Sequence, residues 1–195
     1  MIGRFVCLLL LCVAGFGCAT AAKPNSADKL AGPRQVFLVR HAERFNDGED
    51  PGLTAIGEAR AQALATALRE AGITAIITTQ WRRTRDSAKP LASQLRITPE
   101  VIPVYEGKAN ENIQEVVAAL RQHQDETVLV VGHITVTNVI AGLGGPRLPT
   151  ICESVFSDLF LFTPAEGDRG LLHLRYGAAE DISQGCQLTR PSKAD

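Results

Sequence analysis

Short apolar runs alternate along this chain with stretches of helical periodicity. The runs are rich in β-branched and aromatic residues and are bounded by Gly, Pro or charged residues, which is typical of buried strands. They predict six strands, at 35–39, 73–78, 101–105, 127–131, 158–162 and 171–176.

Between these runs, apolar residues recur at helical spacing. Thr54 has the side chain of an N-cap, and Asn112 with Glu115 resembles a capping box. Pro90 falls inside the second periodic stretch, where it should kink the helix or delay its regular start. Four helices are predicted, near 54–72, 88–95, 112–120 and 135–143.

Strands that alternate with helices indicate an α/β domain, with a three-layer α/β/α arrangement and a mostly parallel central sheet. The last two predicted strands have no helix between them, so one of them can run antiparallel. At 195 residues, 45% hydrophobic and 21% charged, the chain has the size and composition of one globular domain. Its formal net charge of -1 gives no field that would favour nucleic acid.

The first residues have the pattern of a bacterial export signal. Arg4 gives a positive start, 5–16 is an apolar run too short to span a bilayer, and small residues follow at 17–21. Two cleavage sites compete: an A-x-A site that ends at Ala21, and a lipoprotein-type site before Cys18. We therefore expect a signal at 1–21, a linker at 22–34 and a domain at 35–195. The location would be periplasmic, with membrane anchoring if Cys18 is lipidated.

Of the five cysteines, Cys152 and Cys186 lie in the expected mature domain. Two remaining cysteines in an oxidising compartment can pair, so a disulfide between them is predicted. Neither lies in a C-x-x-C motif, which gives no support to a cysteine-based zinc site.

Three predicted strands end in residues that carry chemistry. Arg40 and His41 follow the first strand, Arg82 and Arg83 follow the second, and His133 follows the fourth. The carboxyl ends of parallel strands meet at one edge of a sheet, where ligands bind. Arginine binds phosphate through two donors, and a neutral imidazole can act as a nucleophile. A second, protonated histidine could stabilise charge on phosphoryl oxygens.

Four motifs in the same order resemble the histidine phosphatase superfamily, with its phosphoglycerate mutase-like fold. Each motif alone is weakly specific, but the four motifs in this order together are strongly specific. The motifs are Arg40-His41-Ala42-Glu43, Leu53-Thr54-Ala55-Ile56-Gly57, the stretch from Thr79 to Ala88, and Gly132-His133.

This resemblance implies that His41 is the nucleophile and becomes phosphohistidine. It implies that Arg40, Arg83 and His133 bind the phosphoryl group and that no metal or other cofactor takes part. Arg44 and Arg82 are weaker candidates, at the rim of the site. The general acid of the family has no clear motif here, and Glu106 is the candidate by its order along the chain, with Glu43 an alternative that fits a supporting role better.

The leading functional hypothesis is a metal-independent phosphatase, of the histidine acid phosphatase type, that acts on phosphomonoesters or on a phosphorylated protein. The partner would be a phosphorylated small molecule or protein, and not nucleic acid. Two alternatives stay open: a phosphoglycerate mutase-type transferase, and a phosphate-binding module without catalysis.

Overall fold

The computed structural model describes residues 32–180 of the chain. The predicted export signal, with Cys18, most of the predicted linker, and Cys186 lie outside the described residues. Within 32–180, no helix combines the length and the apolar character needed to cross a membrane. Cys152 is disulfide-bonded, and its pairing with Cys186 stays a prediction.

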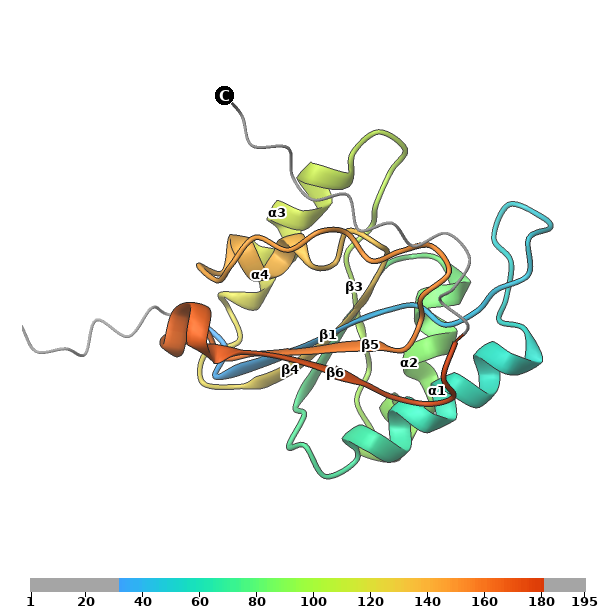
Figure 1. Cartoon of the computed structure of the whole chain (residues 1–195), viewed down its shortest axis with the longest axis horizontal. Helices are drawn as coiled ribbons and strands as arrows, with labels where there is room; N and C mark the ends of the chain where they lie inside the picture. The colour runs from blue at the N-terminus through green and yellow to red at the C-terminus, as the bar shows by residue number, and fades with distance from the viewer. Residues whose placement is uncertain (1–31, 181–195) are drawn as a thin grey trace, which may run out of the picture.

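The core of the domain is a six-stranded mixed sheet (Figure 1). The strand order is β3-β2-β4-β1-β5-β6. The first four strands in this order are parallel, while β5 pairs antiparallel with β1 and β6 pairs antiparallel with β5. The strands are β1 (Gln35–Arg40), β2 (Ala75–Thr78), β3 (Glu100–Val101), β4 (Thr127–Gly132), β5 (Asp158–Phe162) and β6 (Leu171–Arg175).

Helices cover both faces of this sheet, which confirms the predicted α/β class. In Figure 1, α3 and α4 lie on one side of the sheet, and α1 and α2 lie on the other. Side chains alternate between the two faces along β1, so Val36 and Leu38 pack in one core and Phe37 and Val39 in the other. The helices are α1 (Ala55–Leu68), α2 (Arg82–Leu95), α3 (Ala109–Leu120) and α4 (Asn138–Gly142), with a 3₁₀ segment η1 (Pro164–Gly170) before β6.

The third strand is shorter than the five residues predicted. Ile102 donates its backbone N–H to the Thr78 carbonyl, 2.9 Å away, as the last ladder contact. Pro103 has no N–H to donate. The N–H of Val104 donates instead to the side-chain oxygen of Gln80 at 2.9 Å, so the apolar run continues as loop rather than as strand.

The predicted capping role of Asn112 is wrong. The third helix begins three residues earlier, at Ala109. The Asn112 amide donates to the carbonyls of Ile102 (3.4 Å) and Pro103 (3.1 Å), so it fastens the helix to the loop after β3. The fourth helix is also shorter than predicted, whereas the second runs unbroken from Arg82 through Pro90, so its start is not delayed.

The turn after β1 is held against the start of α1. Thr54 is the N-cap, as predicted, and its side chain accepts from the Gly57 N–H at 3.1 Å. Thr54 also donates its backbone N–H to the Glu43 carbonyl at 3.0 Å. That carbonyl lies so close to Gly57 that a Cβ there would overlap it. The glycine of the Leu-Thr-x-x-Gly motif is therefore required by a backbone contact.

We expect Gly57→Ala to destabilise the fold and to lower activity, because the rigid Glu43 carbonyl cannot move away from a new methyl group. Overpacking of this kind costs about 1–3 kcal/mol, which lowers Tm by roughly 2–4 °C per kcal/mol in a domain of this size. Thermal unfolding of Gly57→Ala beside Gly72→Ala tests this, because a Cβ at Gly72 meets nothing within 4 Å and reports only backbone strain at φ +71. A Tm for Gly57→Ala equal to that of the unsubstituted protein would contradict this packing.

Candidate active site

The two candidate histidines meet at the carboxyl ends of β1 and β4. Arg40 pairs with Gly132 in the strand register, and the His41 N–H donates to the Gly132 carbonyl at 2.9 Å. The ring centroids of His41 and His133 are 5.5 Å apart, with the rings edge to face. Two residues that are distant in the sequence thus form one site.

The hydrogen bond of His41 determines which ring nitrogen is free. Nδ1 lies 2.8 Å from the carbonyl oxygen of Ala42. A carbonyl can only accept, so Nδ1 carries the proton and Nε2 keeps its lone pair. Burial is the largest cause that lowers the pKa of His41; the Ala42 carbonyl opposes it and the nearby Arg40, His133 and Arg83 add to it, for a net pKa of about 3. His41 is therefore neutral at neutral pH.

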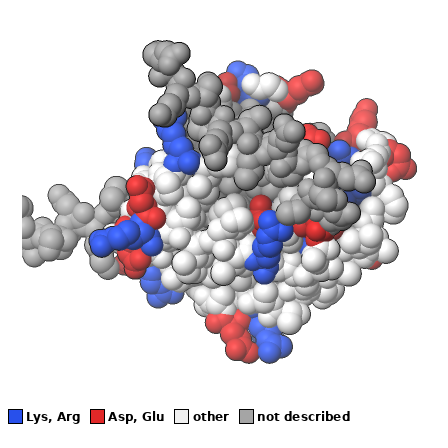
Figure 2. Space-filling view, viewed as in Figure 1, with Lys and Arg blue, Asp and Glu red and all other residues white. Residues whose placement is uncertain are grey.

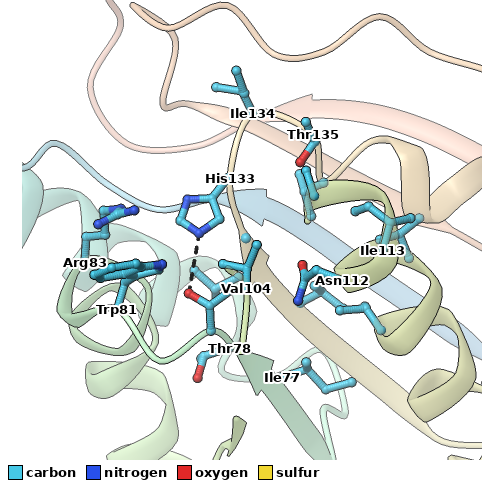
Figure 3. Close-up of a pocket in the computed structure, with 18 of the residues that line it drawn as sticks. Ile77, Thr78, Trp81, Arg83, Val104, Asn112, Ile113, His133, Ile134 and Thr135 are labelled. Atoms are coloured by element: carbon cyan, nitrogen blue, oxygen red, sulfur yellow. Dashed lines mark hydrogen bonds between the residues drawn. The ribbon is translucent and has the colours of Figure 1, made fainter. Parts of the chain in front are cut away.

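His133 has a similar environment. Burial, followed by Arg83, Arg40 and Arg44, lowers the pKa of His133 to about 4. Its Nε2 lies 3.5 Å from the hydroxyl of Thr79, a contact drawn as a dashed line in Figure 3. Without a bound anion, this second imidazole is neutral as well.

Arg40 is fixed by the backbone of a distant loop. Its Nη1 donates to the carbonyls of Cys152 (3.0 Å), Glu153 and Val155 (3.2 Å), and its guanidinium lies 4.1 Å from the ring centroid of Phe156. Burial lowers the pKa of Arg40 to about 10, so it stays charged at neutral pH. Its buried Nε has no hydrogen-bond partner within the described part of the chain. A buried, unpaired N–H on a cation is a donor suited to an anion.

Two further arginines complete the cationic side of the site. Arg83 lies with its guanidinium 4.9 Å from the Trp81 ring centroid, and burial and the charge of Arg44 lower the pKa of Arg83. The charge of Arg44 also lowers the pKa of Arg40 and of His133. Arg82 is different: its side chain is 57% exposed and faces Asp86, so it belongs to the surface.

Glu106 lies at the rim of a cavity of about 460 Å³ that Arg83 and His133 also line. The Glu106 side chain is exposed. The structure therefore brings Glu106 to the side of the site where Arg83 and His133 lie, and no contact between Glu106 and His41 is seen.

Glu43, the other acidic candidate, is engaged in an ion pair. Both of its oxygens accept from Arg60 Nε at 3.0 Å, and Oε1 accepts from Nη2 at 2.7 Å. Arg60 is 3% exposed and also contacts Glu180 at 3.2 Å. Glu180 in turn accepts from the Phe156 N–H and the Ser157 hydroxyl, each at 2.6 Å. Glu43 thus supports the site through this network and is not placed to donate a proton.

Sequence reasoning did not identify Arg60, Phe156 or Glu180. Ser87 lies in the motif from Thr79 to Ala88, and its hydroxyl accepts from the Ala42 N–H at 2.8 Å and fixes the turn after His41. The hydroxyl at that motif position was a signal that could have found it. The other three depend on contacts across the fold and carry no local motif.

The site has the character of an anion site. The charges of Arg40 and Arg83 act on both neutral imidazoles, and the charge of Arg44 acts on His133. Among residues 32–180, no three His, Cys, Asp or Glu side chains are grouped to hold a metal ion. A phosphoryl-sized anion is the ligand that these charges favour.

The buried His41 and the half-buried His133 should make the protein less stable in mild acid. Both have pKa values below the ordinary 6.5, about 3 and about 4, so between these values and pH 6.5 the unfolded chain binds more protons than the folded one. Stability then falls as pH decreases through this window, by up to about 1.4 kcal/mol per pH unit for each histidine. Urea unfolding between pH 7 and pH 4.5 measures this slope.

The matched control for this slope is His173, which is 49% exposed and paired with Asp158 at 2.9 Å. The slope should decrease in His133→Ala and stay similar in His173→Ala. Inorganic phosphate should also reduce it, because a bound anion favours the protonated rings. An unchanged slope in His133→Ala would show that other groups cause the loss.

Comparison with known proteins agrees with this site. Residues 36–104 match the model of the histidine phosphatase superfamily (branch 1). The probable phosphoglycerate mutase GpmB of Yersinia enterocolitica is 43% identical over 65 residues, and the same is found for GpmB of Escherichia coli. Each alignment covers 30% of this chain and 30% of the relative, so the match spans about a third of the length of these curated relatives. His133 and Glu106 lie beyond the segment matched by the family model.

Solved structures extend the likeness to the whole described domain. The protein histidine phosphatase SixA complexed with tungstate aligns with a TM-score of 0.54 at 16% identity, over 74% of this chain and 96% of that one. A mycobacterial glucosyl-3-phosphoglycerate phosphatase aligns with a TM-score of 0.53 at 14% identity, over 75% and 99%. At such identities the likeness concerns the fold, here the phosphoglycerate mutase-like fold. Residues 36–104 are thus similar to the histidine phosphatase superfamily, and the motifs and the fold agree with this match.

Proposed function

We propose that this protein is a phosphatase that hydrolyses phosphomonoesters through a phosphohistidine at His41. The observation that carries the proposal is the Nδ1 hydrogen bond of His41 to the Ala42 carbonyl. It leaves Nε2 of a neutral imidazole as a nucleophile within the influence of the Arg40 and Arg83 charges. Phosphatases are found among the proteins of the same fold, and probable mutases among the sequence relatives, so hydrolysis or transfer of a phosphoryl group is the chemistry common to them.

In the first step, Nε2 of His41 attacks phosphorus and the bond from phosphorus to the ester oxygen breaks. His133 takes up a proton from solvent when the phosphate dianion binds and returns it when phosphate leaves. The three arginines and this protonated His133 bind the equatorial oxygens and stabilise their charge. The leaving oxygen takes a proton from Glu106. The low pKa of the free imidazole keeps the nucleophile unprotonated.

In the second step, water attacks the phosphohistidine. The bond from phosphorus to Nε2 breaks, inorganic phosphate leaves, and the proton of the water returns to Glu106. His41 is then neutral again, and its Nδ1–H donates to the Ala42 carbonyl throughout.

Rapid quench with a ³²P-labelled aryl phosphate, in the presence of EDTA, tests the proposal. We expect one label per chain on His41, stable in base and lost in acid, together with a burst of phenol and steady release of phosphate. Phosphate that binds without any turnover would instead support the alternative of a non-catalytic binding module. Label that moves to a second position of a phosphoglycerate would favour a mutase.

Glu106→Gln should lower turnover of alkyl phosphates by about 10²-fold, the lower end for a general acid, because Glu106 is exposed. Aryl phosphates with acidic phenols need little proton donation and should lose much less. Steady-state kinetics on both substrates measures the difference, with Glu111→Gln as control, since Glu111 is exposed and pairs with Lys108. Equal losses on both substrates would assign Glu106 to binding or folding.

A further inference from the structure

Glu106 is only one of the residues that line the cavity beside the histidines, and the proposed function leaves the others without a role. We propose that it is a leaving-group pocket, so that the preferred substrates are monoesters of apolar alkyl or aryl alcohols rather than phosphorylated sugars or glycerates. This inference rests on the proposed function and specifies its substrate class.

The cavity lies between the sheet and α3, on the face of the sheet where Val36 and Leu38 pack (Figure 3). Its volume of about 460 Å³ falls within the range of small-molecule sites. Most of the side chains in its wall are aliphatic, and they come from β2, the loop after β3, α3 and the segment from β4 to α4: Ile77, Val104, Ile113, Val116, Val136 and Val139.

Two residues belong both to the histidine site and to this cavity. Arg83 and His133 line the cavity, and both influence the pKa of His41. Figure 3 shows Arg83 and Trp81 on one side of His133, and Asn112 and Ile113 of α3 on the other. An ester with its phosphoryl group against Arg83 and His133 can therefore place its alcohol part in the cavity.

The charges in the wall argue against a second anionic group. Of the side chains that line the cavity, only Arg83, His133 and Glu106 are ionisable apart from the phenol of Tyr105. A carboxylate or second phosphate placed among the valines and isoleucines would lose its hydration without gaining a cation. For sugar hydroxyls, the Asn112 amide already donates to the carbonyls of Ile102 and Pro103 and the Thr79 hydroxyl already bonds Thr84. The hydroxyls of Thr78 and Thr135 remain in a wall that is otherwise largely aliphatic.

A series of n-alkyl phosphates, from ethyl upward, measures the contribution of the cavity. The basicity of the leaving alcohol is nearly constant along such a series, so changes in kcat/KM report binding of the chain. We expect kcat/KM to rise about three- to fourfold per added methylene, until the chain fills the cavity, and to be far lower for glycerol phosphate and 3-phosphoglycerate.

Direct binding gives a readout that does not need turnover. Trp81 is the only tryptophan of the chain and lines the cavity. Titration with non-hydrolysable n-alkylphosphonates, followed by Trp81 fluorescence, should show Kd falling with each methylene by the same factor.

Ala109→Phe tests the location of this selectivity. Ala109 is an exposed residue at the start of α3 that lines the cavity, and a ring there would occupy space meant for the alcohol. The rise of kcat/KM and the fall of Kd per methylene should become smaller in Ala109→Phe and in a second variant, Val104→Phe. Ala67→Phe is the control, because Ala67 is exposed on α1, on the other side of the sheet, and it should retain the full gain.

The outcomes separate the two proposals. A flat series with good turnover of aryl phosphates overturns the leaving-group pocket and leaves the phosphatase standing. A Kd that falls along the phosphonate series without hydrolysis of any monoester overturns the phosphatase and leaves an apolar phosphate-binding pocket. A full methylene gain in both Ala109→Phe and Val104→Phe would place the selectivity elsewhere.

Discussion

His41→Ala should abolish both the covalent label and turnover, with kcat lower by about 10⁴-fold or more, as for loss of other enzyme nucleophiles. The reason is geometric: Nε2 of His41 is the free lone pair beside the arginines, and His133 has its Nε2 near Thr79 instead. Rapid-quench labelling and steady-state kinetics on an aryl phosphate measure the two losses.

His123→Ala is the matched control for this variant. His123 lies just after α3, with its ring nitrogens 3.4 Å from carboxylates of Glu100 and Glu126. None of these residues belongs to the candidate site. The control variant should keep both label and turnover. Substantial turnover in His41→Ala, with the fold intact by circular dichroism, would show that another group is the nucleophile.

Arg40→Lys should lower kcat/KM by about 10³-fold, the upper end for loss of one donor to a charged transition state. Lysine has three donors and no planar fork. If its ammonium stays with the carbonyls of Cys152, Glu153 and Val155, no donor is left for the phosphoryl group. If it turns to the phosphoryl group, those carbonyls lose their partner.

Arg82→Lys is the control for the same change of side chain, since Arg82 is exposed at the surface and lies in a different motif, next to Arg83. It should cost less than about tenfold, in line with the small contribution of exposed ion pairs. Phosphate affinity should follow the same order, with Arg40→Lys much weaker than Arg82→Lys. Equal losses in the two variants would mean that Arg40 acts only through the 152–155 loop.

Much of the fold follows from local patterns. The run 36–39 reads as a buried strand because each of its residues lies in one of the two cores, and Thr54 reads as a cap because its hydroxyl bonds Gly57. The third strand and the third helix were misjudged for one reason. Gln80 and Asn112 hold the loop after β3 through side chains from elsewhere in the chain, and propensity does not include such contacts.

The site divides in a similar way. Arg40, His41, Arg83 and His133 could be found because each follows a predicted strand or begins the helix after it, where the sheet gathers ligands. Phe156, Arg60 and Glu180 could not, because their roles come from packing between segments that no short pattern connects. Figure 2 illustrates why charge gives little help: basic and acidic side chains are interspersed on the face it shows, and net charge is -1.

The strand that leads to His41, β1, is synthesised long before the two strands that pair with it, β4 and β5. β1 pairs with β4 on one side, from Gln35 opposite Thr127 to Arg40 opposite Gly132, and with β5 on the other. Pairing of strands that are so far apart in the sequence is slow, because the chain loses loop-closure entropy before the strand contacts stabilise it. During synthesis the apolar run 36–39 therefore waits unpaired and is prone to association. The yield of active protein should depend on chaperone supply and growth temperature more strongly than on the stability of the finished domain.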